Sequence, residues 1–440
     1  MSKPRLSVIG TGYLGATHAV CMAELGYDVI GLDVDQSKIA RLAAGEVPFF
    51  EPGLDELLRK ALDSGRLRFT TSYEEIVAEA DVHFLCVGTP QRKGEFAADM
   101  TYVDAAVDAL APLLDRPCVV AGKSTVPVGT AERIAAQLRE QAPAGDDVEL
   151  VWNPEFLREG YAVEDTLRPD RLVFGVTSTH GEAVMRAAFA PLIDADIPVV
   201  ITDLATAQLV KVSANAFLAT KISFINAMAE VCESVHADVK KLSEALSYDS
   251  RIGGRFLHAG LGFGGGCLPK DIRAFMARAG ELGVDQALSF LQEVDAINQR
   301  RRARMVDLAR ECVDDAFRGR RVGVLGAAFK PNSDDIRDSP ALDVATRIHR
   351  AGAVVTVYDP AALDNARRDY PDLDYATSAE DAVADADVVL HLTEWQEFRD
   401  LDPHRLAERV RQRHIVDGRN ALDARRWRDA GWHYRALGRP

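Results

Sequence analysis

The stretch "VIGTGYLGATHA", residues 8–19, decides the fold class of this chain. It places Gly10, Gly12 and Gly15 in G-x-G-x-x-G spacing after an apolar strand and at the start of a helical pattern, and Asp33 ends the next predicted strand. Together these features are the fingerprint of a dinucleotide-binding βαβ unit. Gly10 permits the tight turn, Gly12 lets a pyrophosphate approach and Gly15 allows helix–strand packing, while the helix N-terminus favours the phosphates.

The carboxylate of Asp33 predicts which dinucleotide binds. It would accept hydrogen bonds from the adenosine ribose hydroxyls and repel a 2′-phosphate, so we expect NAD rather than NADP. A glycine turn with a capping aspartate is the alternative interpretation, and it explains less of the pattern. The residues of the fingerprint and its surroundings that we expect in the cofactor site are Gly10, Gly12, Tyr13, Leu14, Gly15, Asp33, Lys38 and Thr89.

Outward from the fingerprint, apolar strands alternate with helical segments to about residue 200, which predicts a parallel α/β sheet. Residues 203–236 contain no proline or glycine and are apolar on more than one face, which predicts one long helix acting as a domain hub or subunit interface. A second strand–helix alternation begins near residue 318. The predicted class is therefore α/β, with two Rossmann-like doubly wound domains, 1–200 and 317–440, joined by a long central helix and a helical middle domain, 201–300.

Composition narrows the function classes. Of 440 residues, 47% are hydrophobic and 27% charged, and the 52 Lys and Arg against 67 Asp and Glu give a net charge of −15, which disfavours a nucleic-acid surface. No signal-peptide stretch or bilayer-length apolar run is present, so we expect a cytoplasmic protein without membrane partners. The six cysteines are scattered, without a CxxC pair or metal-ligand spacing, which predicts reduced thiols and no metal.

One cysteine stands in an unusual setting, "GLGFGGGCLPKD", residues 260–271. Pro269 favours the first turn of a helix, which would put Cys267 at the helix N-terminus with Lys270 nearby, and both effects favour a thiolate. Asp271 follows by about one turn and can share the site. We expect the glycines to let backbone and substrate come close. The alternative is a small buried cysteine before a proline-capped helix.

Several motifs, spread in family order over residues 5–420, resemble the UDP-glucose/GDP-mannose dehydrogenase family. They are "KSTVPVGT" (123–130), "NPEFLREG" (153–160), "GFGGGCLPKD" (262–271), "AFKPNSDDIRDSP" (328–340), "TEWQEF" (393–398) and "DGRN" (417–420). The resemblance implies oxidation of a sugar C6 alcohol to a carboxylate with two NAD, through a thiohemiacetal and a thioester on Cys267. We expect UDP-glucose as substrate, with GDP-mannose as the alternative. A catalytically inactive nucleotide-sugar sensor is the contrasting hypothesis.

The resemblance also implies residue roles. Lys211 and Asn215, four apart on the long helix, would stabilise oxyanion character, and Glu159 would act as acid or base with Thr125 positioning it or the hydrolytic water. By pattern alone, Lys211 could equally extend its ammonium group to solvent, and Asn215 could be a core residue with its hydrogen bonds made within the protein. The predicted catalytic set is Cys267, Lys211, Asn215, Asp271, Glu159 and Thr125. Thr125, Glu159, Lys270 and Arg337 join the predicted cofactor site.

The resemblance assigns a larger set of residues to the nucleotide sugar. Its members are Glu155, Phe156, Leu157, Arg158, Glu159, Lys211, Asn215, Arg251, Phe256, Leu257, His258, Ala259, Gly260, Gly264, Lys330 and Arg419. The cations among them would face the diphosphate, although a single Lys or Arg is usually a solvated surface group. Arg251 is expected to reach across a dimer interface, so we expect a homodimer or a larger homo-oligomer.

Overall fold

The computed structural model describes residues 3–439 and divides into two compact units, each of which is described by itself. The first unit runs to Ala214 and includes Arg273–Leu282. The second comprises Asn215–Ile272 and the residues from Gly283 onward. The predicted middle domain is thereby divided between the units, and its boundaries stay a prediction.

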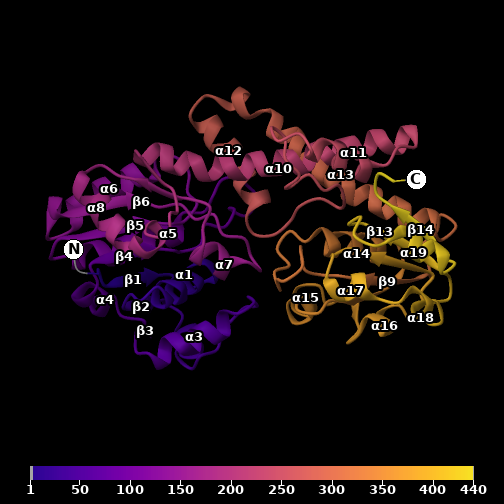
Figure 1. Cartoon of the computed structure of the whole chain (residues 1–440), viewed down its shortest axis with the longest axis horizontal. Coiled ribbons are helices and arrows are strands. Elements are labelled where there is room, and N and C mark those ends of the chain that lie inside the picture. Colours follow the sequence, from indigo (N-terminus) through magenta and orange to yellow (C-terminus); the bar gives the residue numbers. More distant parts are fainter. Residues whose placement is uncertain (1–2, 440) are drawn as a thin grey trace. The chain divides into compact units, whose positions relative to one another are not determined.

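The first unit contains an eight-stranded sheet in the order β3-β2-β1-β4-β5-β6-β7-β8 (Figure 1). Its strands are β1 (Leu6–Ile9), β2 (Val29–Leu32), β3 (Leu67–Thr70), β4 (Val82–Leu85), β5 (Cys118–Gly122), β6 (Val148–Trp152), β7 (Leu172–Gly175) and β8 (Val199–Thr202). The first six strands are parallel and follow the Rossmann order. The expectation of a wholly parallel sheet is wrong at one place, because β7 pairs antiparallel with β6 at Trp152 and Gly175. The connection between these two strands carries the loop that follows β6 and the short helix α7 (Ala162–Leu167).

Helices cover both faces of this sheet because successive strand residues point to opposite sides. Leu6 and Val8 of β1 belong to one apolar core and Ile9 to another. The helices are α1 (Tyr13–Glu24), α2 (Gln36–Ala43), α3 (Leu54–Asp63), α4 (Tyr73–Glu79), α5 (Thr101–Leu110), α6 (Thr130–Gln141), α7, α8 (Thr179–Ala188) and α9 (Ala190–Ile193). Gly26 follows α1 with a φ of +89°, the left-handed conformation that commonly ends a helix.

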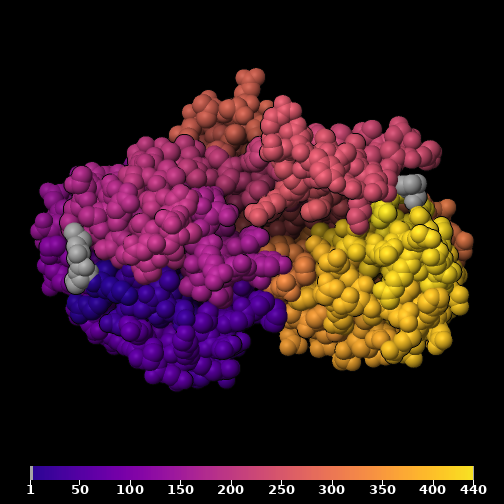
Figure 2. Space-filling view, viewed as in Figure 1, coloured from indigo at the N-terminus to yellow at the C-terminus, as the bar shows by residue number. Residues whose placement is uncertain are grey.

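The second unit contains a six-stranded, fully parallel sheet in the order β11-β10-β9-β12-β13-β14, drawn orange to yellow in Figure 1. The residues that form this sheet and its helices have the same colours on the surface in Figure 2. Its strands are β9 (Arg321–Leu325), β10 (Val354–Tyr358), β11 (Asp374–Tyr375), β12 (Val388–His391), β13 (His414–Asp417) and β14 (His433–Ala436). Its helices are α13 (Phe290–Glu311), α14 (Pro340–Arg350), α15 (Leu363–Asp369), α16 (Ala379–Ala382), α17 (Gln396–Asp400), α18 (Pro403–Ala407) and α19 (Ala424–Asp429). The predicted second doubly wound sheet is confirmed.

The long helix is also confirmed, as α10 (Leu204–Val235), followed by α11 (Val239–Ser247) and later by α12 (Leu268–Glu281). Both α10 and α12 contribute residues to each unit. A small apolar core that includes Ile225, Ala229 and Leu257 packs the 256–260 loop against α10 within the second unit. Among the helices of residues 3–439, none combines the length and hydropathy that a bilayer-crossing helix requires.

Candidate active site

The fingerprint loop in the first unit leaves room for a phosphate at the start of α1. Gly10 has a φ of +89°, and a Cβ on Gly15 would lie 1.8 Å from the Gly10 carbonyl oxygen, so both positions require glycine. A Cβ on Gly12 would meet no atom within 4 Å. The open space therefore lies beside the N–H groups of the helix start, where a pyrophosphate would be held. These residues fit an NAD.

Asp33 directly follows β2 and stays ionised. Its carboxylate accepts hydrogen bonds from the Thr11 N–H at 2.9 Å and from Lys38 Nζ at 2.8 Å. Burial would raise the pKa of Asp33, but the hydrogen bonds from Lys38 and the Asp35 N–H outweigh it and hold the pKa below its usual value. Lys38, predicted as a cofactor residue, is thus the ion-pair partner of Asp33 in this structure.

Thr89 and Thr125 come together near the carboxyl ends of β4 and β5. The Thr89 hydroxyl donates to the Thr125 carbonyl oxygen at 2.7 Å. Thr125 is half-buried, and Thr89 is buried. Because ligands of doubly wound sheets bind at the carboxyl ends of the strands, both threonines lie at the edge where a cofactor is expected.

The "NPEFLREG" loop follows β6, and Glu155 organises it. Its carboxylate lies 3.1 Å from Lys123 Nζ and accepts from the Phe156 N–H at 2.7 Å, while Lys123 also donates to the Asn153 side chain at 2.9 Å. Burial would raise the pKa of Glu155, but the Lys123 ammonium and the Phe156 N–H hold it below the usual value. In this structure the Glu155 carboxylate therefore contacts Lys123 and the backbone of its own loop. Sequence analysis did not identify Lys123 as its partner.

Other side chains of this loop are also held in place. The Arg171 guanidinium carbon lies 3.6 Å from the centroid of the Phe156 ring, and Lys211 Nζ lies 5.5 Å from it. Arg158 makes a two-pronged ion pair with Asp165, at 2.9 and 2.7 Å. Glu159 is buried and Leu157 half-buried. Arg171 was not predicted, because no motif contains it.

A buried carboxylate, Glu51, ties the fingerprint helix to the end of this loop. Its two oxygens accept the N–H groups of Gly160 and Ala162, both at 2.7 Å, and the Tyr13 hydroxyl donates to it. Burial and the Glu51 carboxylate raise the pKa of Tyr13, which therefore remains a donor. Glu51 fixes the backbone directly after Glu159. A lone glutamate in "FFEPG" offered no sequence signal for this contact.

Replacing Glu51 by glutamine is expected to loosen this clamp. The amide nitrogen would face one of the two buried N–H groups, leaving it unpaired, which costs about 2 kcal/mol in the free energy of unfolding. Hydrogen exchange at the Gly160 and Ala162 amides should accelerate in the folded protein. Glu56→Gln on the exposed surface of α3 is the matched control and should change neither quantity. Unchanged exchange in Glu51→Gln would contradict the clamp.

In the second unit, Cys267 stands at the N-terminus of α12, as predicted. The Asp271 N–H donates to the Cys267 carbonyl at 3.0 Å, the first hydrogen bond of the helix, and Pro269 lies in its first turn. Cys267 is exposed, whereas the other five cysteines are buried. An exposed thiol at a helix N-terminus is the setting that favours a reactive thiolate.

The structure gathers Asn215, Lys270 and Asp271 within hydrogen-bonding distance. Asn215 Nδ2 donates to Asp271 Oδ2 at 2.6 Å, and Lys270 Nζ lies 2.5 Å from Asp271 Oδ1. Asp271 and Asn215 are both buried. Lys270 was predicted to contact the cofactor, and in this structure it forms an ion pair with Asp271. Asn215 lies on α10, one turn after Lys211.

The glycines before Cys267 let other segments of the second unit come close, as the prediction had it for the backbone. A Cβ on Gly262 would lie 2.1 Å from the Asn298 side-chain oxygen, one on Gly264 2.3 Å from the Asp338 carbonyl, and one on Gly266 2.2 Å from the Arg337 guanidinium. The contact of Gly264 with a substrate stays a prediction. Glycine is required here because the chain itself approaches so closely.

The adjoining 256–260 loop is pinned by polar side chains. The Gly260 N–H donates to Asn226 Oδ1 at 2.9 Å, and Asn420 donates to the Ala259 carbonyl at 3.1 Å. Leu257 is buried and His258 exposed, while Phe256 has a φ of +63°. His258 is therefore the side chain of this loop most available to a ligand.

Arg419 was predicted to face a diphosphate, but its donors point to the backbone. They reach the carbonyl oxygens of Leu392 at 2.6 Å, Gly262 at 2.9 Å and Phe329 at 3.0 Å. Burial lowers the pKa of Arg419 despite the nearby Glu394 carboxylate. In this structure Arg419 joins three segments of the second unit, and its contact with a substrate stays a prediction.

The remaining predicted cations are more exposed. Arg251 is 86% exposed and pairs with Asp249 in its own turn. Arg337 pairs with Asp335 through two nitrogens, at 3.0 and 2.7 Å. Lys330 Nζ lies 5.4 Å from the centroid of the Phe329 ring. The contacts of these three side chains with a ligand or a partner stay predictions.

The fold and these groups define the class: an NAD-binding dehydrogenase with a second doubly wound sheet and an exposed cysteine at a helix N-terminus. Comparison of the sequence with protein-family models supports this class. Residues 4–193 match the NAD binding domain, residues 205–300 the central domain and residues 323–424 the UDP binding domain of the UDP-glucose/GDP-mannose dehydrogenase family. The chain belongs to this family.

Individual relatives match over nearly the whole chain. UDP-glucose 6-dehydrogenase of Rhizobium meliloti (strain 1021) is 43% identical, covering 99% of this chain and 100% of that protein. UDP-glucose 6-dehydrogenase TuaD of Bacillus subtilis (strain 168) is 40% identical, covering 99% and 93%. The structure of a UDP-glucose dehydrogenase from Pyrobaculum islandicum superposes with a TM-score of 0.91 at 38% identity, covering 99% and 98%.

Proposed function

We propose that this protein is an NAD-dependent UDP-glucose 6-dehydrogenase, which oxidises the C6 alcohol of UDP-glucose to a carboxylate. The observation that carries the proposal is the exposed Cys267 thiol at the N-terminus of α12, one turn before the buried Asp271–Asn215 pair. The relatives named above are UDP-glucose dehydrogenases at 38–43% identity over nearly their full length. The six cysteines form no disulfide, which is consistent with a protein of the cytoplasm.

NAD would supply the hydride acceptor for both oxidations. Gly10, Gly12 and Gly15 with the start of α1 would hold the pyrophosphate, and Asp33 the adenosine ribose. Thr89 and Thr125 lie at the carboxyl ends of neighbouring strands and would line the same site. By resemblance to the family, Arg337 would be a further cofactor contact.

Cys267 would make the four-electron reaction possible without release of an aldehyde. After the alcohol has lost a hydride and a proton, the thiolate adds to the aldehyde carbon and gives a thiohemiacetal. Loss of a second hydride and the hydroxyl proton leaves a thioester on Cys267. Attack by water breaks the carbon–sulfur bond, releases the carboxylate and restores the thiol.

Other predicted catalytic residues would stabilise the charged intermediates of this reaction. Asn215 and Lys211 would donate to the oxyanion that forms during thiol addition and hydrolysis. Asp271, buried and held by Asn215 and Lys270, would keep the asparagine amide oriented and accept a proton from water. Glu159, with its backbone fixed by Glu51, would be the second acid or base, assisted by Thr125.

The substrate assignment is tested with a panel of nucleotide sugars and NAD. We expect kcat/KM for UDP-glucose to exceed that for GDP-mannose by at least about 100-fold, since the differences in base and sugar change several hydrogen bonds. A preference for GDP-mannose would overturn the substrate. Binding of UDP-glucose without any NADH formation would favour the sensor hypothesis.

We further propose that the protein is a homodimer formed through α10. One stripe of this helix within the second unit leaves large apolar side chains in solvent: Phe217 (67% exposed), Phe224 (49%), Val231 (54%) and Val235 (64%). These positions recur on one helical face, and such stripes mark association surfaces. A second copy of the chain is the proposed occupant, and the exposed Arg251 would reach its substrate.

Phe224→Asp is expected to convert the dimer to a monomer. A carboxylate in the middle of a desolvated apolar interface would be unpaired, which weakens association by several kcal/mol, on the order of 100-fold or more in the dissociation constant. Sedimentation velocity measures the change. Phe96→Asp, an equally exposed phenylalanine in the first unit, is the control and should leave the mass unchanged. A parent protein that is monomeric at micromolar concentration would contradict the proposal.

A further inference from the structure

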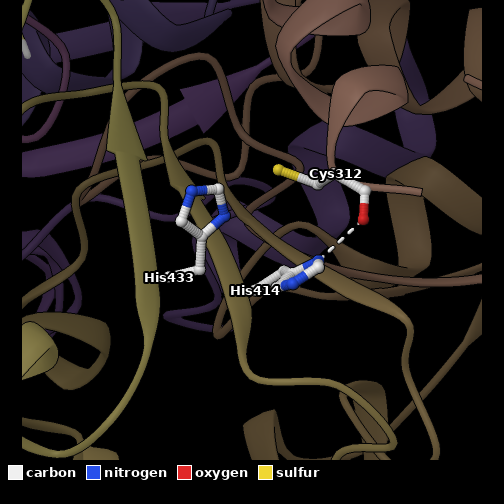
Figure 3. Close-up of side chains that lie close together, drawn as sticks. All are labelled: Cys312, His414 and His433. Atoms are coloured by element: carbon white, nitrogen blue, oxygen red, sulfur yellow. Dashed lines mark hydrogen bonds between the residues drawn. The ribbon is translucent and has the colours of Figure 1, made fainter. Parts of the chain in front are cut away.

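Three metal-ligating side chains converge in the second unit, outside the residues discussed so far. Cys312 follows the last residue of α13, His414 begins β13, and His433 begins β14. Figure 3 shows the three side chains lying close together, with the His414 ring beside the Cys312 carbonyl. One donor atom from each lies within 4.8 Å of the other two.

The sheet itself brings the two histidines together. His414 and His433 are directly opposite each other in the parallel β13–β14 pair, so their side chains leave the same face of the sheet. Their ring centroids are 5.2 Å apart. Cys312 is separated from His414 by 102 residues, which is why sequence spacing predicted no metal site.

A hydrogen bond prepares His414 to act as a ligand. His414 Nδ1 lies 2.7 Å from the Cys312 carbonyl oxygen, drawn as the dashed line in Figure 3. A carbonyl can only accept, so Nδ1 carries a hydrogen, and in the neutral tautomer with that hydrogen Nε2 offers a lone pair to a metal ion. Metal-ligating histidines are typically oriented in this way by a second hydrogen bond.

The cluster is accessible from solvent on one side. Cys312 is buried, His414 half-buried and His433 exposed, so the cluster opens to solvent on the His433 side. The nearby Arg435 is neutralised by Glu311, at 2.5 Å. No ring nitrogen of His433 and no sulfur contact of Cys312 is committed to a hydrogen bond among residues 3–439.

We propose that Cys312, His414 and His433 form a binding site for a zinc-class divalent cation, with the Cys312 thiolate, His414 Nε2 and a His433 ring nitrogen as ligands. Sulfur and imidazole nitrogen are the donors that zinc prefers, and water completes its tetrahedron. In such a tetrahedron the donors stand roughly 3.5 Å apart, so side-chain movements of about 1 Å close the site. The thiol proton is released to solvent when the sulfur binds.

The position of the site indicates a stabilising role. An ion held there would join the end of α13 to the first residues of β13 and β14. These are the amino ends of the strands, whereas Arg419 follows the carboxyl end of β13. The cation would therefore strengthen the second unit and take no part in the oxidation.

Cobalt titration of the full-length protein tests the proposal. Cys267→Ser serves as the background, because it removes the exposed thiol as a competing ligand. We expect a thiolate-to-cobalt charge-transfer band that saturates at about one cobalt per chain and is removed by added Zn²⁺. His433→Ala, a surface change that preserves folding, should weaken binding by roughly 100-fold or more.

His404→Ala on α18, which changes another exposed histidine, is the matched control and should retain the band. Thermal unfolding gives an independent measurement, since excess Zn²⁺ should raise the unfolding midpoint of the background protein and leave that of His433→Ala unchanged. Absence of the band in the background protein, or its survival in His433→Ala, would overturn the site.

Discussion

Replacing Cys267 by alanine is expected to lower the rate of complete oxidation of UDP-glucose by roughly 10³-fold or more, because the variant lacks the thiol that is proposed to hold the aldehyde covalently. Replacing it by serine should slow the reaction comparably for a different reason. An ester on serine hydrolyses more slowly than a thioester, so the intermediate should accumulate. Intact-protein mass spectrometry of Cys267→Ser after incubation with UDP-glucose and NAD should therefore show a covalent adduct.

The matched control is Cys118→Ala, which alters a buried thiol at the start of β5 in the first unit. It should retain the parent rate, which separates loss of the nucleophile from loss of any cysteine. Cys267 is exposed, so its replacement should leave the thermal unfolding midpoint nearly unchanged. Normal four-electron turnover by Cys267→Ala would refute the covalent route.

Asp271→Asn is expected to lower kcat by about 10²- to 10³-fold. The carboxylate is 2% exposed and accepts from Asn215 at 2.6 Å while neutralising Lys270 at 2.5 Å. The asparagine side chain has the same size but no charge, so it cannot form the ion pair with Lys270. It also cannot accept a proton from the attacking water. Because binding of UDP-glucose does not depend on that base, KM should change far less than kcat.

Hydrolysis is the step expected to fail in this variant, so a thioester on Cys267 should accumulate and appear as a mass increase under single-turnover conditions. Asp285→Asn, an exposed aspartate beyond α12, is the control and should retain the parent kcat. A kcat within about threefold of the parent for Asp271→Asn would exclude Asp271 from the chemistry.

Local patterns predicted much of this structure. The glycine fingerprint and Asp33 predicted the NAD-binding site in the first unit. This was possible because the glycine turn, the helix N-terminus and the end of the second strand all belong to one βαβ segment. The absence of proline and glycine predicted α10 nearly to the residue, since helix formation there requires no information from elsewhere. Pro269 similarly predicted the start of α12, and with it the position of Cys267 at the helix N-terminus.

Features that depend on distant contacts could not be predicted. Glu51 clamps Gly160 and Ala162 across 109 and 111 residues, and no pattern near Glu51 records that contact. The antiparallel β6–β7 pair depends on the path of the intervening loop. Arg419 has the side chain of a phosphate ligand, yet its surroundings offer three backbone carbonyls, a fact visible only once the chain is folded.

In the proposed mechanism, one active site carries UDP-glucose through both oxidations on Cys267. The amount of NADH formed per UDP-glucose consumed, with the sugar nucleotide limiting and NAD in excess, tests this mechanism most directly. We expect two NADH for each UDP-glucose and UDP-glucuronate as the product. One NADH with a released aldehyde, or no NADH at all, would contradict it.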